Sequence, residues 1–414
     1  MNSIQKVKIG DFGDIITGKT PSSKNPEDFG PDIMFITPPD FRNHKYLHRS
    51  DRRLSIDGKN KLLSKLLPAK SIMVTCIGEI GNIALNKGEA ITNQQINSII
   101  VNAEMFDIDY LYYVLIQSKK YLNNNAGQTV VPILSKTEFE KIKLPIHKNK
   151  DVQKNIGLVL SSIDSKIDIN NIINAEIESM AKTIYDYWFV QFDFPDKNGN
   201  PYKSSGGKMV WNEKLKRKIP ERWEVNKLVE IESNIVTGKT PPTKNNDFYN
   251  GAIPFVTIGD IRGNMHIINA ETTLTKAGAD YQKNKYLPKG SLCVSCIASP
   301  GMIGLTTQEC QTNQQINSII FKENKNKIYL YHALNNYFNF SAGPKMGNTF
   351  ANMNKGDFES ILLIHPPTDI IKKFEEYLDS TFEQNKLLSF ENKKLSELRD
   401  FLLPMLMNGQ VTVS

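Results

Sequence analysis

The sequence predicts a mixed α/β (α+β) fold with two duplicated globular domains, joined by two long antiparallel helices that form a coiled coil with pseudo-twofold symmetry. Two observations predict it: a long-range internal repeat, and two helical stretches much longer than any other element. The predicted segments are a first domain at 1–150, a long helix at 151–193, a linker at 194–212, a second domain at 213–368 and a second long helix at 369–414.

The repeat has a constant offset of 220 residues. Nine residues, Thr92 to Ile100, recur unchanged as Thr312 to Ile320, and Thr17-Gly18-Lys19-Thr20-Pro21 returns at 237–241. We call these the TNQQ motif (92–95 and 312–315) and the TGKTP motif (17–21 and 237–241). A fixed offset over more than a hundred residues predicts two equivalent folds, whereas repeats of roughly 20 to 50 residues would predict a solenoid or propeller. A duplicated domain favours a bipartite target.

Within each repeat the pattern is one of short strands followed by a helix. In the first repeat, β-branched or apolar runs at 33–37, 71–77 and 96–101 are bounded by Pro, Gly, Asn and Asp, which is typical of strands. The stretch 110–121 has the apolar content of a helix that covers a core.

The long helices are predicted at about 152–188 and 370–403, where apolar residues recur every three or four positions. A helix of about 35 residues spans on the order of 50 Å, so two packed helices can act as a ruler. Asn170 and Asn385 lie on or beside the apolar seam, where polar residues commonly fix register. The alternative is that both are solvated. Turn-forming residues at 194–201 and 204–207 predict the linker.

Charge and composition bound the function classes. Residues 1–150 carry 21 Lys and Arg against 15 Asp and Glu, and residues 213–367 carry 18 against 13, whereas the rest of the chain is acidic. Basic domains favour a polyanionic partner, although lysine-rich solvated surfaces are common. No apolar run approaches the ~20 residues of a membrane helix, and the first residues lack the apolar core of a signal peptide. We therefore expect a cytoplasmic protein without a membrane partner.

These features together resemble the specificity subunit of type I restriction-modification enzymes, over essentially the whole chain. The likeness rests on the order domain, helix, domain, helix, on the TGKTP motif opening both domains, and on the segments 185–195, Leu144-Pro145 with Asp164, and 403–409. The resemblance implies two target-recognition domains that each read one half of a split double-stranded DNA sequence. It also implies that the helices set the gap and bind two methyltransferase (modification) subunits, with two motor-nuclease (restriction) subunits completing the enzyme.

The same resemblance implies a chain that is not an enzyme by itself, with no catalytic residues and no cofactor of its own. S-adenosylmethionine, ATP and Mg are then expected on the partner subunits, which methylate adenine at N6 or translocate and cleave DNA.

Two other functions have sequence signals. Gly13 to Thr20 matches a P-loop, but Pro21 opposes the helix that must start there, and the second copy has Ser233 in place of Gly13. Thr37-Pro38-Pro39-Asp40-Phe41 is only partly like the motif of adenine methyltransferases, and no glycine-rich nucleotide motif accompanies it. A P-loop ATPase, a self-contained restriction-methylation enzyme and a protein scaffold without DNA binding remain the alternatives.

No metal site is predicted. Cys293 and Cys296 have the spacing of half a zinc site, but a second pair is missing, so buried thiols are the better interpretation.

The duplication separates shared DNA contacts from discriminating ones. Positions identical in both copies do not distinguish two different half-sites, so we expect phosphate contacts or scaffold roles there. The shared candidates are Lys19, Thr20, Lys24, Gln94 and Gln95, with the counterparts Lys239, Thr240, Lys244, Gln314 and Gln315. The amides of the TNQQ motif are alternatively expected to satisfy buried backbone groups, and the lysines to be merely solubilising.

Discrimination is expected where the copies diverge and side chains can pair with base edges. The candidates in the first domain are Arg42, Asn43, His44, Glu79, Gln128 and Thr129, and those in the second are Arg262, Asn264, Ser299, Asn348 and Thr349. Arg42 and Arg262 coincide, so they are expected either as phosphate clamps or as guanine readers.

The end of the first long helix is rich in aromatic residues. Tyr187, Trp188, Phe189 and Phe192 are predicted to be exposed and to anchor a modification subunit, with a capped end of the coiled coil as the alternative.

Overall fold

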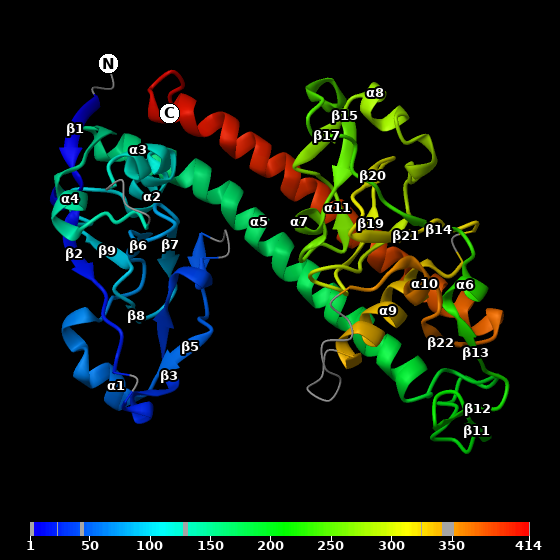
Figure 1. Cartoon of the computed structure of the whole chain (residues 1–414). Coiled ribbons are helices and arrows are strands. Elements are labelled where there is room, and N and C mark those ends of the chain that lie inside the picture. Colours follow the sequence, from blue (N-terminus) through cyan, green and yellow to red (C-terminus); the bar gives the residue numbers. More distant parts are fainter. Residues whose placement is uncertain are drawn as a thin grey trace. The chain divides into compact units, whose positions relative to one another are not determined.

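The computed structural model describes residues 4–22, 24–41, 45–126, 131–323, 325–341 and 352–413. The chain divides into two compact units. The first comprises Met1–Ile169 with Lys394–Ser414, and the second comprises Asn170–Lys393. Each unit therefore combines a globular domain with parts of both long helices (Figure 1). The fold is mixed α/β, as the sequence predicts.

The first unit is built on a five-stranded sheet of order β2-β9-β6-β7-β4. Its neighbouring strands are antiparallel except for the parallel pair β4 and β7. A three-stranded sheet of order β5-β3-β8 and the pair β1-β10 complete it. The strands are β1 Ile4–Lys8, β2 Gly13–Thr17, β3 Phe29–Ile36, β4 Tyr46–Leu47, β5 Arg52–Leu54, β6 Ile72–Thr75, β7 Ile83–Asn86, β8 Ala90–Thr92, β9 Ile96–Val101 and β10 Lys143–His147.

Short helices cover these sheets. They are α1 Ile56–Lys61, α2 Ile108–Gln117, α3 Lys119–Asn124 and α4 Lys136–Lys141, and the long helix α5 Lys150–Tyr185 begins in this unit. The side chain of Asp107 caps α2 by accepting the N–H of Tyr110 at 2.8 Å. Every residue of β6 and β7 is buried, which explains their almost continuous apolar sequences. Ile156 and Leu160 of α5 pack in the same core as Leu403 and Leu406 from the C-terminal helix.

The second unit has sheets of the same order, β14-β21-β18-β19-β16 and β17-β15-β20, and the pair β13-β22. A further hairpin, β11-β12, precedes them. The strands are β11 Met209–Asn212, β12 Arg217–Pro220, β13 Glu224–Lys227, β14 Ile235–Thr237, β15 Tyr249–Val256, β16 His266–Ile267, β17 Thr272–Leu274, β18 Leu292–Ser295, β19 Ile303–Thr306, β20 Gln311–Thr312, β21 Ile316–Ile319 and β22 Leu362–His365.

The helices of the second unit are α6 Leu228–Ile231, α7 Ile258–Ile261, α8 Lys276–Asp280, α9 Lys327–Ser341, α10 Lys355–Glu359 and the long α11 Thr368–Met407, whose last turns belong to the first unit. After α5, residues Asp186–Val190 form a π-helical turn. None of the helices in the described ranges is long and apolar enough to cross a membrane.

The segment that we predicted as a linker is more structured than its turn-forming composition suggests. Phe194 is buried in the core of the second unit, and the β11-β12 hairpin begins at Met209. The ring of Phe194 stacks on Tyr202, with 4.7 Å between the ring centroids. Aromatic packing thus anchors 194–212 to the second domain, because these few rings bury apolar area that the turn residues lack.

Candidate nucleic-acid interface

The TNQQ motif forms the turn that carries the chain from β8 of one sheet to β9 of the other. The Asn93 side chain organises this turn: its Oδ1 accepts the N–H of Gln95 at 3.1 Å, and its Nδ2 donates to Gln95 Oε1 at 2.8 Å. Asn313 and Gln315 make the same two bonds, at 3.1 and 3.0 Å. The identical sequence therefore encodes an identical local hydrogen-bond pattern in both units.

The TGKTP motif follows β2 and lies directly against this turn. The N–H of Gly18 donates to Ile96 O at 3.2 Å, and the N–H of Lys19 donates to Thr92 O at 2.9 Å. A Cβ on Gly18 would lie 2.2 Å from the carbonyl oxygens of Thr92 and Asn93, so the close approach requires glycine. Gly238 is in the same position, with 2.2 Å to Asn313 O.

Side chains join the two motifs as well. The hydroxyl of Thr20 donates to Gln94 Oε1 at 2.6 Å, and that of Thr17 donates to Asn97 Oδ1 at 2.6 Å. The second unit repeats both bonds at 2.6 Å. Lys19 and Gln94 are exposed beside this contact. We call this surface the platform; it consists of Lys19, Thr20, Gln94 and Gln95 in the first unit and Lys239, Thr240, Gln314 and Gln315 in the second.

The shared candidates divide according to burial. Gln95 and Gln315 are half-buried, and their side chains bind the asparagines that organise the turn. They thus have a structural role within the domain. Gln94 and Gln314 are exposed, and only the oxygen of each amide is engaged with a threonine among the described residues. The four shared lysine candidates are also exposed: Lys19, Lys24, Lys239 and Lys244.

The divergent candidates are only partly described. Glu79 is exposed in a turn after β6, where its Oε2 accepts Asn82 Nδ2 at 3.1 Å. Ser299 is half-buried in the matching turn of the second unit, and Arg262 and Asn264 are exposed after α7. Arg42, Asn43, His44, Gln128, Thr129, Asn348 and Thr349 lie outside the described residues.

Two aspartates that we did not single out from the sequence, Asp40 and Asp260, bind the backbone on either side of divergent segments. Asp40 Oδ2 accepts the N–H of Thr37 at 2.7 Å, and its Oδ1 accepts the N–H of Asp51 at 2.8 Å. Asp260 bonds Thr257 at 2.7 Å and Glu271 at 2.9 Å in the same way. The signal was present in the sequence, because Thr-x-x-Asp at both 37–40 and 257–260 is a capping-box pattern.

A buried lysine, Lys45, connects the first domain with the long helices. Lys45 Nζ lies 2.6 Å from Asp109 Oδ1 of α2 and donates to Ser161 Oγ of α5 at 2.7 Å. Burial lowers the pKa of Lys45, and the carboxylate of Asp109 opposes that shift. Tyr113 donates to Asp164 Oδ2 at 2.5 Å, and Arg399 Nη1 lies 2.9 Å from Asp164 Oδ1. This network ties the first domain to both long helices, and no sequence pattern indicated it.

The two seam asparagines are buried at helix contacts within the second unit. Asn170 Nδ2 of α5 donates to Glu391 Oε2 at 2.7 Å and to Asn392 Oδ1 at 2.9 Å of α11. Asn385 Nδ2 of α11 donates to Glu178 Oε1 of α5 at 3.1 Å. Residue numbers rise along one helix as they fall along the other, so the helices are antiparallel here. Solvation, the alternative for both asparagines, is excluded by their exposed fractions of 0% and 1%.

The predicted exposure of the aromatic segment is wrong for three of its four residues. Trp188, Phe189 and Phe192 are buried in the core of the second unit, and only Tyr187 is exposed, at 39%. The ring of Phe189 packs against Phe374 with 4.8 Å between centroids. Large aromatic rings at a helix end bury more apolar area in a core than on a surface, and sequence spacing does not reveal which surface receives them.

The remaining motifs do not form a site of another kind. Gly13–Thr17 is strand β2, and Lys19 and Thr20 lie in irregular backbone, whereas a P-loop needs a helix that begins at these residues. All four cysteines are free and buried, as we predicted. In the described ranges, no group of three or more His, Cys, Asp or Glu side chains is arranged to hold a metal ion.

Comparison with known proteins identifies relatives over the whole length. The chain matches the family model of the type I restriction modification DNA specificity domain over residues 1–179 and 220–398. The type I restriction enzyme HindI specificity subunit of Haemophilus influenzae is 26% identical over 447 residues, covering 92% of this chain and 95% of the relative. The MjaIX specificity subunit of Methanocaldococcus jannaschii is 27% identical over 427 residues, covering 98% and 93%.

A crystal structure of a type I restriction-modification system S subunit from M. genitalium has a similar fold. Its TM-score is 0.58 at 15% identity, with 98% of this chain and 96% of that chain covered.

Proposed function

This chain belongs to the type I restriction-modification DNA specificity family, and we propose that each of its two domains reads one half of a bipartite double-stranded DNA target. It is a specificity subunit. The two domains would be duplicated target-recognition domains in a pseudo-twofold arrangement, 1–150 and 213–368, with the antiparallel long helices as a coiled-coil spacer between them. In this proposal the chain catalyses no reaction by itself.

The observation that carries the proposal is the platform. In both units an exposed lysine precedes a threonine, and the hydroxyl of that threonine holds an exposed glutamine amide by the same hydrogen bond. Lysine side chains and amide N–H groups are common ligands of DNA phosphates, which are the same at every base pair. A shared platform thus suits sequence-independent contacts in each half-site.

Base reading would come from the segments that differ between the two domains. Asp40 binds the backbone of Thr37 and Asp51, and Asp260 binds that of Thr257 and Glu271, so each aspartate joins chain segments before and after the divergent residues. Arg262 and Asn264 have side chains that pair with guanine and adenine edges in the major groove. Variable side chains on a fixed backbone allow the recognised DNA sequence to change without a change of fold.

The long helices would set the spacing and bind the two methyltransferase subunits. In α5 the large apolar side chains of Leu158 and Ile169 in the first unit are 64% and 52% exposed, and Ile172 in the second is 58% exposed. Exposed apolar side chains on a polar helix favour a protein partner. These residues replace the buried aromatics as our candidates for the partner surface. S-adenosylmethionine, ATP and Mg would be bound by the methyltransferase and the two motor-nuclease subunits.

The ATPase and scaffold alternatives have less support. The ATPase hypothesis needs Lys19 at the start of a helix, and its backbone is not helical. The scaffold hypothesis gives no reason for two platforms of basic and amide groups.

The test is co-expression with the neighbouring methyltransferase subunit, followed by single-molecule sequencing of the host DNA for N6-methyladenine. We expect methylation at one split motif. Exchange of residues 1–145 with those of a relative should change one half of the motif, and exchange of 213–367 the other. Methylation without a partner would refute the non-catalytic role, and no methylation with a verified complex would favour the scaffold.

A further inference from the structure

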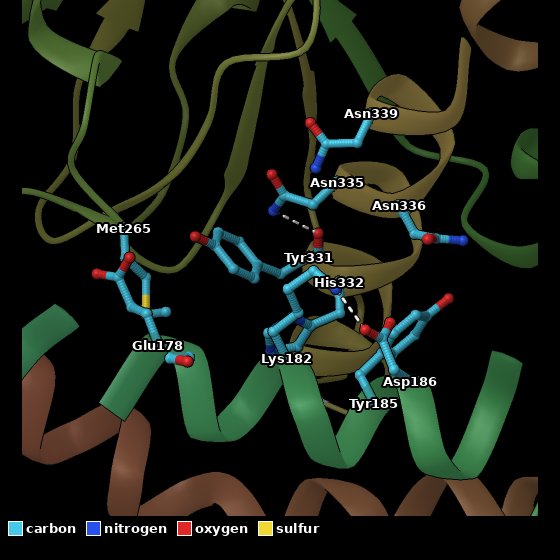
Figure 2. Close-up of a pocket in the computed structure, with 11 residues that line it drawn as sticks. Glu178, Lys182, Tyr185, Asp186, Met265, Tyr331, His332, Asn335, Asn336 and Asn339 are labelled. Atoms are coloured by element: carbon cyan, nitrogen blue, oxygen red, sulfur yellow. Dashed lines mark hydrogen bonds and ion pairs between the residues drawn. The ribbon is translucent and has the colours of Figure 1, made fainter. Parts of the chain in front are cut away.

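The second unit contains a cavity of about 330 Å³ between α5 and α9, beside Met265 (Figure 2). Glu178 and Lys182 line it from α5, Asp186 lines it from the π-helical turn after α5, and His332 and Asn335 line it from α9. A volume of a few hundred cubic ångströms is that of a small-molecule or side-chain site. Apart from Glu178, which accepts a hydrogen bond from Asn385, these side chains have no role in the proposed DNA recognition.

His332 is the group in the cavity wall that lacks a partner. Its side chain is only 5% exposed, and its Nε2 is buried without a hydrogen bond to any described residue. Burial lowers the pKa of His332 to about 3, and the charge of Lys182 adds to this shift. The imidazole is therefore neutral at physiological pH, and a neutral imidazole can present a bare nitrogen as an acceptor. Because Nε2 itself is shielded by the surrounding side chains, an occupant of the cavity meets the neutral ring of His332 and not this nitrogen.

The other polar groups of the wall are also rich in acceptors. Glu178 receives one bond, from Asn385 Nδ2 at 3.1 Å, and burial raises the pKa of its carboxyl. Asn335 spends its Nδ2 on Tyr331 O at 2.8 Å, which leaves the side-chain oxygen as an acceptor. Donors are present as well, on Ser179, Lys182, Tyr185, Tyr331, Asn336 and Asn339.

The one ammonium in the wall is turned to another partner. Lys182 forms an ion pair with Asp186 one helical turn away, and its side chain is 60% exposed. Burial has raised the pKa of Glu178. A cation bound nearby would favour the ionised carboxylate and would form an ion pair with it.

The first unit fills the corresponding place with a lysine. Met265 stands 220 residues after Lys45 of the first unit, whereas α9 matches α2 at an offset of 219, so that His332 stands where α2 has Tyr113 and Tyr331 where it has Tyr112. Lys45 Nζ lies 3.3 Å from the Tyr113 hydroxyl and 4.6 Å from the centroid of that ring. One domain thus holds an ammonium of its own at this junction with the helices, and the other has an apolar side chain and a cavity.

The acidic residue at this place also comes from a different helix in the second unit. Asp109, which pairs with Lys45, corresponds to Ile328 in α9. The carboxylate of the second unit is instead Glu178 of α5, so the cavity has kept an anion while losing the intrachain cation.

We propose that this cavity binds an organic ammonium or guanidinium group supplied from outside the chain, either by a small amine or by a basic side chain of a partner subunit. Glu178 provides the charge, the Asn335 oxygen accepts an N–H group, and the neutral ring of His332 forms part of the wall. The alkyl part lies against Met265. The proposal does not depend on DNA reading.

The direct test uses butylammonium chloride as the probe and butanol as its uncharged analogue, with binding to the full chain measured by calorimetry and by the shift of the melting temperature. We expect butylammonium to bind and butanol not to bind. Glu178→Gln should weaken binding at least tenfold. Glu176→Gln is the matched control, because it removes the same charge from an exposed side chain of the same helix.

Met265→Lys provides a second variant, because it supplies the ammonium in the manner of the first unit. It should retain the fold by circular dichroism and no longer bind butylammonium. Equal affinity of the Glu178→Gln and Glu176→Gln variants, or equal binding of butanol, would overturn the proposal.

The assembled complex with the methyltransferase subunit distinguishes the two sources of the cation. If the cation is a partner's side chain, the complex excludes butylammonium and Glu178→Gln weakens assembly. If it is a free amine, the complex binds the probe as the isolated chain does. DNA methylation is measured separately, so the failure of this site and the failure of DNA recognition give different results.

Discussion

The hydroxyl of Thr20 donates to the side-chain oxygen of Gln94 at 2.6 Å, across 74 residues of sequence. Thr240 and Gln314 make the same bond at the same distance. Because the threonine engages the oxygen of the amide, the NH₂ group is the part left to meet a phosphate. The relationship joins the two most repetitive motifs of the chain into one surface, and it orients the donors of that surface.

Replacement of Gln94 with Ala should weaken DNA binding about tenfold, since a hydrogen bond to a charged group contributes roughly 1.5–3 kcal/mol. The loss should be similar for cognate and scrambled duplexes, because phosphates are the same in both. Fluorescence anisotropy with the two duplexes measures this. Lys24→Ala removes an exposed charge and should lower both the affinity and its salt dependence. A change in the methylated motif of Gln94→Ala would show that this amide reads bases.

Gly18→Ala should destabilise the first unit by at least about 2 kcal/mol, because the added methyl group would overlap two backbone oxygens that are 2.2 Å away. Urea unfolding measures the loss. Gly88→Ala is the control, since a Cβ there meets nothing closer than 4.0 Å. Equal stability of the two variants would mean that the TGKTP backbone can move away from the TNQQ turn.

Asn170→Ala should lower the free energy of unfolding by about 1–3 kcal/mol, because Glu391 and Asn392 lose the donor that they share at a buried position. Ser162→Ala on the same helix removes only a bond to its own backbone and should cost less. If Asn170 also sets the helix register, the DNA gap should change in the variant, which methylome sequencing would detect.

Stability should depend on pH through Glu375 of α11. Its Oε1 accepts the N–H of Tyr329 at 2.8 Å, and burial raises the pKa of Glu375 from an ordinary value of 4.5 to about 7. Between these pH values the folded chain keeps a proton that the unfolded chain releases, so the free energy of unfolding falls as pH rises from 4.5 to 7. The total loss is roughly 3 kcal/mol.

Glu375→Gln should remove this part of the pH dependence, as urea unfolding at pH 5 and pH 8 would reveal. Glu376→Gln is the control, because that side chain is 65% exposed. Parallel pH curves for the wild type and Glu375→Gln would show that the carboxyl ionises freely in the folded chain.

Leu158→Asp with Ile169→Asp should reduce co-purification of the methyltransferase subunit while the melting temperature stays unchanged. The two residues are eleven positions apart, so they lie within about 20° of each other on the helix. Ala175→Asp adds a charge at an exposed position of the same helix as the control. In contrast, Trp188→Ala should lose stability, since its ring is buried. Unchanged co-purification would place the partner surface elsewhere.

The sequence by itself determined the features that repeat or have a short period. The offset of 220 residues predicted two similar sets of elements, and apolar spacing predicted the long helices, because a helix or strand is specified by neighbours within a few residues. The strand at 96–101 lies where its β-branched run predicted it. The family followed from the order of these parts.

Only the tertiary structure decided which residues meet across the chain. The Lys45–Asp109 pair, the buried state of Trp188 and the bond between Thr20 and Gln94 join residues from different elements. A local sequence pattern does not specify contacts between distant elements. An aromatic run has the same spacing whether it packs in a core or faces solvent. Burial and hydrogen bonding are properties of the assembled fold, because the cost of an unpaired polar group depends on what surrounds it.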